Sequence, residues 1–149
     1  MYQQLIGSLL YLVNTRPDIC YAVNALSQHM VEPRQVHWTT TKHVLRYLRG
    51  TVCYRARYTS SGGVKLVGFT KSDWTGSEIN RKSTYGCCFN LGSNMVSWFS
   101  EKQTSVALST TEAEYIIVCA TGKEALWLWK MLADLYGHEI DVTMIFCDN

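Results

Sequence analysis

The sequence predicts an α+β or α/β fold, in which a short helical segment at the N-terminus precedes several strands and one long helix. Apolar residues recur at helical spacing through the first third of the chain. Short apolar runs separated by turn residues follow, and such runs are typical of strands. A long apolar stripe at helical spacing over residues 111–136 then precedes a final apolar run, which predicts a helix and a last strand.

Length and composition indicate a globular chain with an uneven charge distribution. The 149 residues suit one ordinary domain or two small pieces, and 47% hydrophobic with 17% charged residues is not the composition of a disordered chain. Residues 1–63 hold seven Lys/Arg against two acids, whereas residues 64–149 hold seven against ten. A basic half beside an acidic half suits a phosphate-binding surface next to a metal-binding one, although two differently solvated surfaces would give the same pattern.

The cysteines and the N-terminus point to an intracellular protein. The six cysteines form no CxxC pair and show no Cys/His spacing typical of zinc. Several lie within apolar runs, so we expect buried, reduced thiols. The first four residues lack a basic leader, and the apolar run over residues 5–13 is too short to span a membrane. We therefore expect a soluble cytoplasmic or nuclear protein that is not bound to a membrane.

Three helices are predicted in the first third of the chain. The first covers the apolar run at residues 5–13, the second opens at Pro17 and ends before Pro33, and the third runs from residue 34 to 48, with Gly50 as its stop. The residues expected to face inward on the third helix are Trp38, Leu45 and Leu48.

A basic stripe lies on the third predicted helix. Lys42, Arg46 and Arg49 fall at positions i, i+4 and i+7, so they share one face. Such a stripe can follow a phosphate backbone, and an ordinary solvated helix face is the competing interpretation.

The remaining elements are five strands and the long helix. The strands are expected at residues 52–58, 64–70, 83–91, 95–99 and 142–147, with turns at 60–63 and 92–94. Gly137 is a natural stop for the long helix. Its apolar stripe, more typical of a core than of a cofactor site, comprises Ala125, Leu128, Trp129, Leu132 and Leu135.

Three segments place carboxylates on a strand, a helix and a strand, in the order used by two-metal nucleases. Asp73 ends a predicted strand. Position 71 lies on the same strand face and holds a lysine, whereas such a site requires an acid there. Glu112 and Glu114 open the long helix about 200° apart, so only one can face a given site. Asp148 follows the last strand. Helix-dipole stabilisation for the two glutamates and turn chemistry for Asp148 are the structural alternatives.

The chain resembles the Pol polyprotein of copia-type LTR retrotransposons over essentially its whole length. The segments that resemble the end of the reverse transcriptase and its connection are Tyr2–Leu12, Thr15–Ile19 and His37–Thr51. The segments that resemble the ribonuclease H which follows are Arg81–Gly86, Val96–Trp98, Ala107–Thr110, Glu112–Tyr115 and Cys147–Asn149.

This resemblance implies a domain organisation and an ancestral activity. Residues 1–50 would be a helical remnant of the reverse transcriptase thumb and connection, and residues 51–149 an incomplete, truncated ribonuclease H-like domain with a mixed sheet crossed by a helix. The implied activity is cleavage of the RNA strand of RNA/DNA hybrids with two Mg²⁺ ions. The polymerase aspartates would lie before Met1, so no polymerase site is expected.

The resemblance also assigns the catalytic and metal-binding acids. They are Asp73 or the position of Lys71, then Glu114 in preference to Glu112, then Asp148, with a fourth beyond Asn149. Because an ammonium repels Mg²⁺, Lys71 and the truncation together predict impaired metal binding and little nuclease activity. The alternatives are a passive module that binds RNA/DNA hybrid or DNA through Lys42, Arg46 and Arg49, and a relic with no selected function.

Overall fold

The computed structural model describes residues 1–59, 65–73, 82–103, 107, 109–138 and 140–147, except the side chains of Ser72 and Asp73. The chain divides into two compact units, Met1–Ala56 and Arg57–Asn149, whereas the sequence prediction divided it after residue 50. No helix in these ranges is long and apolar enough to cross a membrane.

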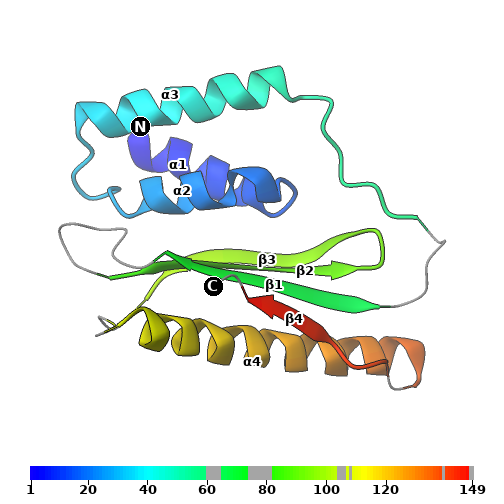
Figure 1. The fold of residues 1–149 in the computed structure, drawn as a ribbon. Coiled ribbons are helices and arrows are strands. Elements are labelled where there is room, and N and C mark those ends of the chain that lie inside the picture. Colours follow the sequence, from blue (N-terminus) through cyan, green and yellow to red (C-terminus); the bar gives the residue numbers. More distant parts are fainter. Residues whose placement is uncertain (60–64, 74–81, 104–106, 108, 139, 148–149) are drawn as a thin grey trace. The chain divides into compact units, whose positions relative to one another are not determined.

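The first unit is helical. It contains α1 (Tyr2–Val13), the 3-10 turn η1 (Pro17–Ile19), α2 (Cys20–Ser27) and α3 (Gln35–Gly50), as shown in Figure 1. The apolar residues of α1 and α2 recur every three or four positions, so each helix buries one stripe. Tyr2 joins the helices, because its hydroxyl donates to the Leu26 carbonyl (3.2 Å) and its ring meets the Trp38 ring edge-on at 5.2 Å.

The inward face of α3 differs from the prediction. Thr41 and Val44 are its buried residues, and Trp38 and Leu48 are half-buried. Leu45 is 39% exposed, so its predicted inward position is wrong. The helix turns Thr41 and Val44 to the core, and Leu45 falls at the margin of that stripe.

The strand predicted at residues 52–58 is also wrong. Residues 51–53 form a turn and residues 54–58 have no regular structure. Val52, Tyr54 and Tyr58 are all more than half exposed. Alternating apolar residues form a strand only where another strand pairs with them and a core covers one face, and the described residues supply neither here.

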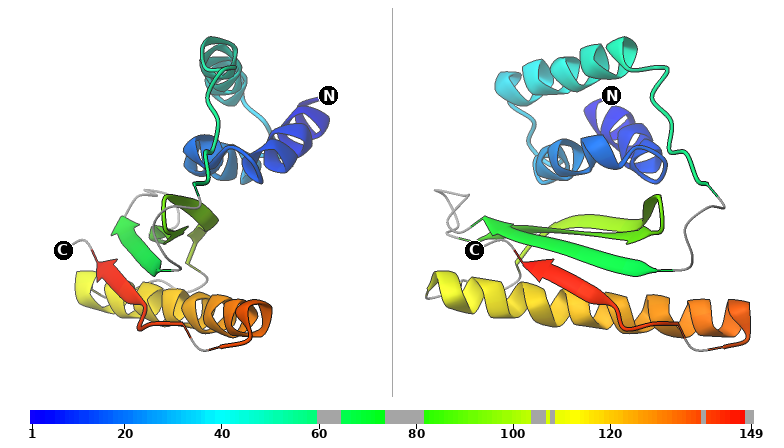
Figure 2. Two further views of the ribbon diagram at one scale, coloured as in Figure 1. Left: turned by 90° about the vertical axis from the view of Figure 1, so that its right-hand side faces the viewer. Right: turned by 45° about the vertical axis from the view of Figure 1, so that its right-hand side comes forward.

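The second unit is a mixed sheet with a long helix. Its strands are β1 (Leu66–Asp73), β2 (Thr84–Leu91), β3 (Asn94–Lys102) and β4 (Met144–Cys147), in the order β3-β2-β1-β4. The first three pair antiparallel, and β4 pairs parallel to β1. Helix α4 (Thr110–Tyr136) joins β3 to β4 in the chain and runs along one face of the sheet (Figure 2). The predicted mixed α and β fold class is confirmed.

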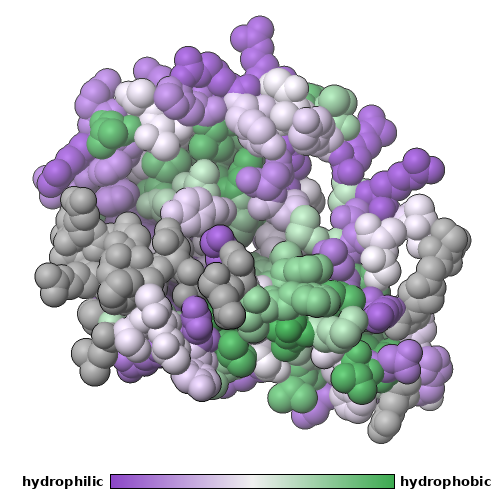
Figure 3. All heavy atoms as spheres, in the orientation of Figure 1, coloured by the Kyte–Doolittle hydropathy of each residue, from purple (hydrophilic) through white to green (hydrophobic). Residues whose placement is uncertain are grey.

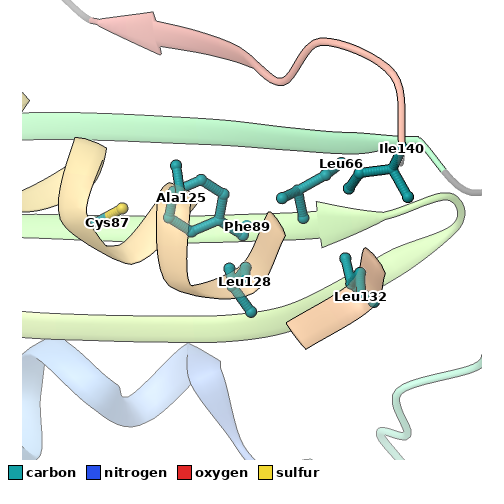
Figure 4. Packing of buried hydrophobic residues seen from close by; sticks show 7 residues of the cluster. All are labelled: Leu66, Cys87, Phe89, Ala125, Leu128, Leu132 and Ile140. Carbon is teal, nitrogen blue, oxygen red and sulfur yellow. The ribbon is translucent and has the colours of Figure 1, made fainter. Parts of the chain in front are cut away.

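The core of this unit lies between α4 and one face of the sheet (Figure 4). Its buried residues are Leu66, Cys87, Phe89, Ala125, Leu128, Leu132 and Ile140. Trp129 packs at the edge of this cluster, and its ring N–H donates to the Ile140 carbonyl at 3.3 Å. Leu135 is 72% exposed, so its predicted place in the stripe is wrong; it lies in the last turn of α4, beyond the part that covers the sheet.

The six cysteines are free thiols, as expected, but burial was predicted too broadly. Cys20 and Cys87 are buried and Cys88 is half-buried, whereas Cys53, Cys119 and Cys147 are exposed.

Candidate functional site

The three predicted acidic segments belong to elements that meet at one end of the sheet. Because β1 and β4 are parallel neighbours, their carboxyl ends lie at the same edge, and Thr70 pairs with Cys147 there. The first turns of α4 lie at this end as well, as Figure 1 shows. The sheet topology thus brings together segments that are far apart in the sequence.

Hydrogen bonds of Gln103 connect the start of α4 to this end of the sheet. Its backbone N–H donates to the Ser83 carbonyl (2.8 Å), and its side-chain amide donates to the Ala113 carbonyl (3.0 Å). Ser83 precedes Thr84, which pairs with Asp73. Gln103 is 2% exposed, so these bonds are shielded from water. The sequence interpretation missed this residue, because nothing local marks a polar side chain that will be buried.

Lys71 lies in β1, opposite Gly86 of β2, and is exposed. Thr70 is buried on the face that α4 covers, and successive side chains alternate, so Lys71 lies on the other face. The backbone of Asp73 pairs with Thr84, while its side chain is not among those described. Asp148 lies outside the described residues.

The first turns of α4 place its two glutamates differently. Ser109 caps the helix by accepting the Glu112 N–H at 3.1 Å, in a Ser-x-x-Glu pattern that the sequence alone could have revealed. Glu112 is exposed in the first turn, where a negative charge favours the helix dipole. Glu114 is half-buried and follows Ala113, which is fully buried. Glu114 is therefore the glutamate that turns partly toward the body of the unit.

The side chains described at this end include only part of the acids that the resemblance assigns to Mg²⁺, because those of Asp73 and Asp148 are not among them. Divalent metals of this type need several hard oxygen ligands. Among the residues that the structure describes, no group of three or more His, Cys, Asp or Glu could hold a metal ion. Lys71 adds a cation at the strand position where the resemblance implies an acid.

The basic stripe predicted on α3 is present and exposed. Lys42, Arg46 and Arg49 are all exposed. Helix α3 contains no Asp or Glu, and none of the three has an ion-pair partner within the described ranges. The face is thus positively charged without local compensation.

Comparison with known proteins finds relatives over nearly the whole chain. No family model and no solved structure matches the chain. The chain is 42% identical over 149 residues to the retrovirus-related Pol polyprotein from transposon TNT 1-94 of Nicotiana tabacum, covering 99% of this chain and 11% of that one. It is 40% identical over 148 residues to the corresponding polyprotein from transposon RE2 of Arabidopsis thaliana, covering 99% and 10%. Over nearly its whole length, the chain is thus homologous to a part of the Pol polyproteins of copia-type retrotransposons.

The two Pol relatives are about ten times longer than the part that this chain matches. A shorter relative is similar over most of its length. The protein named secreted RxLR effector protein 161 of Plasmopara viticola is 45% identical over 128 residues, which cover 85% of this chain and 90% of that protein.

Proposed function

We propose that the chain corresponds to the reverse transcriptase/ribonuclease H part of a copia-type Pol polyprotein, and that its second unit derives from a two-metal nuclease acting on RNA/DNA hybrids. The observation that carries this proposal is the meeting of β1, β4 and the start of α4 at one end of a mixed sheet. In such nucleases the acids come from a strand, a helix and a strand. Glu114 on α4 is the acid that we assign to the helix position.

We further propose that the nuclease site is inactive. Phosphodiester hydrolysis requires an activated water, a stabilised leaving oxygen and neutralisation of developing negative charge, which two divalent ions supply together. Carboxylates must hold those ions. Lys71 brings a fixed positive charge to β1, and it repels a divalent cation that an aspartate there would attract.

Metal binding tests this role of Lys71 without relying on activity. Mn²⁺ can replace Mg²⁺ and is visible by electron paramagnetic resonance. We expect the full chain to bind Mn²⁺ weakly and Lys71→Asp to bind it at least about tenfold more tightly, because the change reverses a charge beside a divalent ion. Lys123→Asp makes the same charge change on an exposed face of α4 and serves as the control. Equal affinities of the chain and Lys71→Asp would exclude position 71 as a ligand position.

The second candidate function is nucleic-acid binding through α3. The specific observation is the exposed stripe of Lys42, Arg46 and Arg49 on a helix without acids. Adjacent turns present these charges along the helix axis, which lets them contact successive phosphates of RNA/DNA hybrid or DNA.

Salt dependence tests this second function. Affinity of the full chain for a labelled RNA/DNA hybrid should fall as salt rises, because bound cations are released from the nucleic acid. Lys42→Ala and Arg46→Ala should each lower the slope of log affinity against log salt by about one. Lys123→Ala removes an exposed lysine from α4 and should leave the slope unchanged. An affinity that responds neither to salt nor to the α3 substitutions eliminates the idea.

A further inference from the structure

Helix α4 carries a further apolar stripe beside the one that packs on the sheet. The core stripe comprises Ala125, Leu128 and Leu132 (Figure 4). The further stripe, whose members are four residues apart, comprises Trp127, Met131 and Leu135. Trp127 and Met131 directly precede Leu128 and Leu132, so their side chains lie about 100° around the helix from the core stripe.

This outer stripe of Trp127, Met131 and Leu135 is exposed. The three residues are 57%, 42% and 72% exposed. Glu124, about one turn earlier on the same side of the helix, accepts a hydrogen bond from the Ser97 hydroxyl of β3 at 2.7 Å. The outer stripe therefore lies on the β3 side of α4. Single exposed apolar residues are ordinary, whereas a row of three large ones on one side of a helix is typical of an interaction surface.

Another exposed apolar patch lies on the opposite face of the sheet. The rings of Phe69 and Phe146 stack there with centroids 5.4 Å apart, and hydrophobic atoms gather over β1 and β4 in Figure 3. Ile145 packs against the core beneath α4, so its neighbour Phe146 belongs to the face that α4 does not cover. This patch is separate from the outer stripe of α4 and supplies an independent control.

Two opposite charges border the outer stripe. Lys123 and Asp134 are both exposed, and both lie on the side of the stripe that is turned away from the core. They are eleven residues apart in the chain, or about 16 Å along the helix, so they cannot pair with each other in one copy. Neither forms an ion pair with any other residue that the structure describes.

We propose that α4 pairs antiparallel with α4 of a second copy of the chain. A two-fold axis brings the same side of both outer stripes together, because such an interface is self-complementary. In a pair centred midway between Lys123 and Asp134, each lysine lies opposite the aspartate of the other copy, and this contact occurs twice. The same register brings Trp127 against Met131 of the second copy. A parallel pair would instead set like charges beside each other.

The size of the surface suits a weak and reversible dimer. The outer stripes and the flanking lysine stems of two copies would bury on the order of 1,000 Å² in total, at the lower end for specific interfaces. Tryptophan is among the residues that most often dominate the free energy of such interfaces. We therefore expect a dissociation constant in the micromolar range. The inference goes beyond the proposed function and does not depend on it.

Charge reversal tests the pairing, with sedimentation equilibrium of the full chain as the measurement. Lys123→Glu and Asp134→Lys should each raise the dissociation constant about tenfold or more, because each variant sets like charges together at two places. An equimolar mixture of the two variants should restore the dimer, because every contact then joins opposite charges. A recovery on mixing cannot arise from folding or from a contact within one chain.

Three further variants distinguish the outer stripe from other apolar surfaces. Trp127→Ala should weaken the dimer about 30-fold or more. Leu126→Ala is the matched control, because Leu126 is 62% exposed but lies about 100° around the helix from Trp127. Phe146→Leu changes the patch on the opposite face of the sheet. Both controls should leave the dissociation constant unchanged.

Three outcomes would overturn the proposal. The first is a chain that stays monomeric at about 500 µM, far above the expected dissociation constant. The second is a dimer that Phe146→Leu dissociates and Trp127→Ala does not, which would place the contact on the other face of the sheet. The third is a dimer that mixing the two charge variants does not restore. Far-UV circular dichroism of each variant verifies that it is folded.

Discussion

At Gly68 in β1, a β-carbon would lie 2.7 Å from Cε1 of Phe89 and 3.3 Å from Cγ1 of Ile145. Phe89 is fully buried and cannot move aside cheaply. We expect Gly68→Ala to lower the free energy of unfolding by about 1–3 kcal/mol, because overpacking outweighs the smaller entropic gain of losing a glycine. Urea denaturation of the full chain measures this loss in the free energy of unfolding. Gly86→Ala is the matched control, since its β-carbon would meet only the Phe99 carbonyl at 3.8 Å, and an equal loss there would refute the steric explanation.

Arg16 and Asp18 form the ion pair that holds the turn before η1 to the end of α3. Two nitrogens of Arg16 donate to the Asp18 carboxylate at 2.9 and 2.7 Å, and Arg16 also donates to the Thr51 carbonyl and hydroxyl. The Tyr47 hydroxyl donates to Asp18 at 2.8 Å. Chiefly through hydrogen bonds from Arg16, the pKa of Asp18 is held below its ordinary value of 3.8, although partial burial opposes this.

The sign of this shift fixes a pH dependence for the first unit. A carboxylate whose pKa is lower in the folded state contributes stability above its unfolded pKa, and this contribution is lost as pH falls through the folded pKa. Asp18→Asn should therefore lower the free energy of unfolding by about 1 kcal/mol at neutral pH, and by progressively less as the pH falls through the lowered pKa of Asp18 in the folded state. Hydrogen exchange of peptides from residues 1–56 measures this loss, with Asp134→Asn on α4 as the control. A cost that does not depend on pH would contradict the account.

At the scale of elements, the start of α4 depends on its cap. The Ser109 hydroxyl accepts the Glu112 N–H, which would otherwise have no partner within the helix. We expect Ser109→Ala to lower the free energy of unfolding by about 1 kcal/mol and Ser109→Asp to lower it much less. Chemical denaturation followed by helical circular dichroism compares these variants with Thr111→Ala, an exposed change in the same turn. If the Thr111 variant lost as much stability, the cap would not be the cause.

The elements show how far periodicity predicts a fold. The helical stripes and the strands β1 to β4 were predictable. Each element buries one face, so its apolar residues recur in the sequence at the spacing of a helix or a strand. Residues 52–58 have the same alternation, but none of the described strands pairs with them, and they form no strand. Leu45 and Leu135 lie at the ends or margins of their stripes, where the tertiary packing decides burial. The parallel pairing of β1 with β4 and the tie through Gln103 are contacts between distant segments, which no local pattern reports.

The candidate sites also differ in whether a local sequence pattern or a contact between distant segments defines them. Lys71 and the stripe of Lys42, Arg46 and Arg49 could be identified from the sequence, because identity and spacing define them. The stacking of Phe69 on Phe146 could not, because it exists only through the parallel pairing of β1 with β4.

At the scale of the whole molecule, charge divides the chain along with its structure. Met1–Ala56 carries six Lys/Arg against two acids, and Arg57–Asn149 carries eight against ten. In the proposed function, the basic helical unit contacts nucleic acid and the acidic unit derives from one that bound metal ions. Our central proposal is that the second unit retains the nuclease framework without a working metal site.

Cleavage of a labelled RNA/DNA hybrid by the purified full chain in Mg²⁺ tests this claim most directly. Glu114→Gln is the control, because it removes the one described acid proposed for the site while keeping the shape of the side chain. The account predicts that the chain and the variant give the same background cleavage, with an active ribonuclease H confirming that the substrate is intact. Mg²⁺-dependent cleavage by the chain that Glu114→Gln abolishes would contradict it, and would show that the site works despite Lys71.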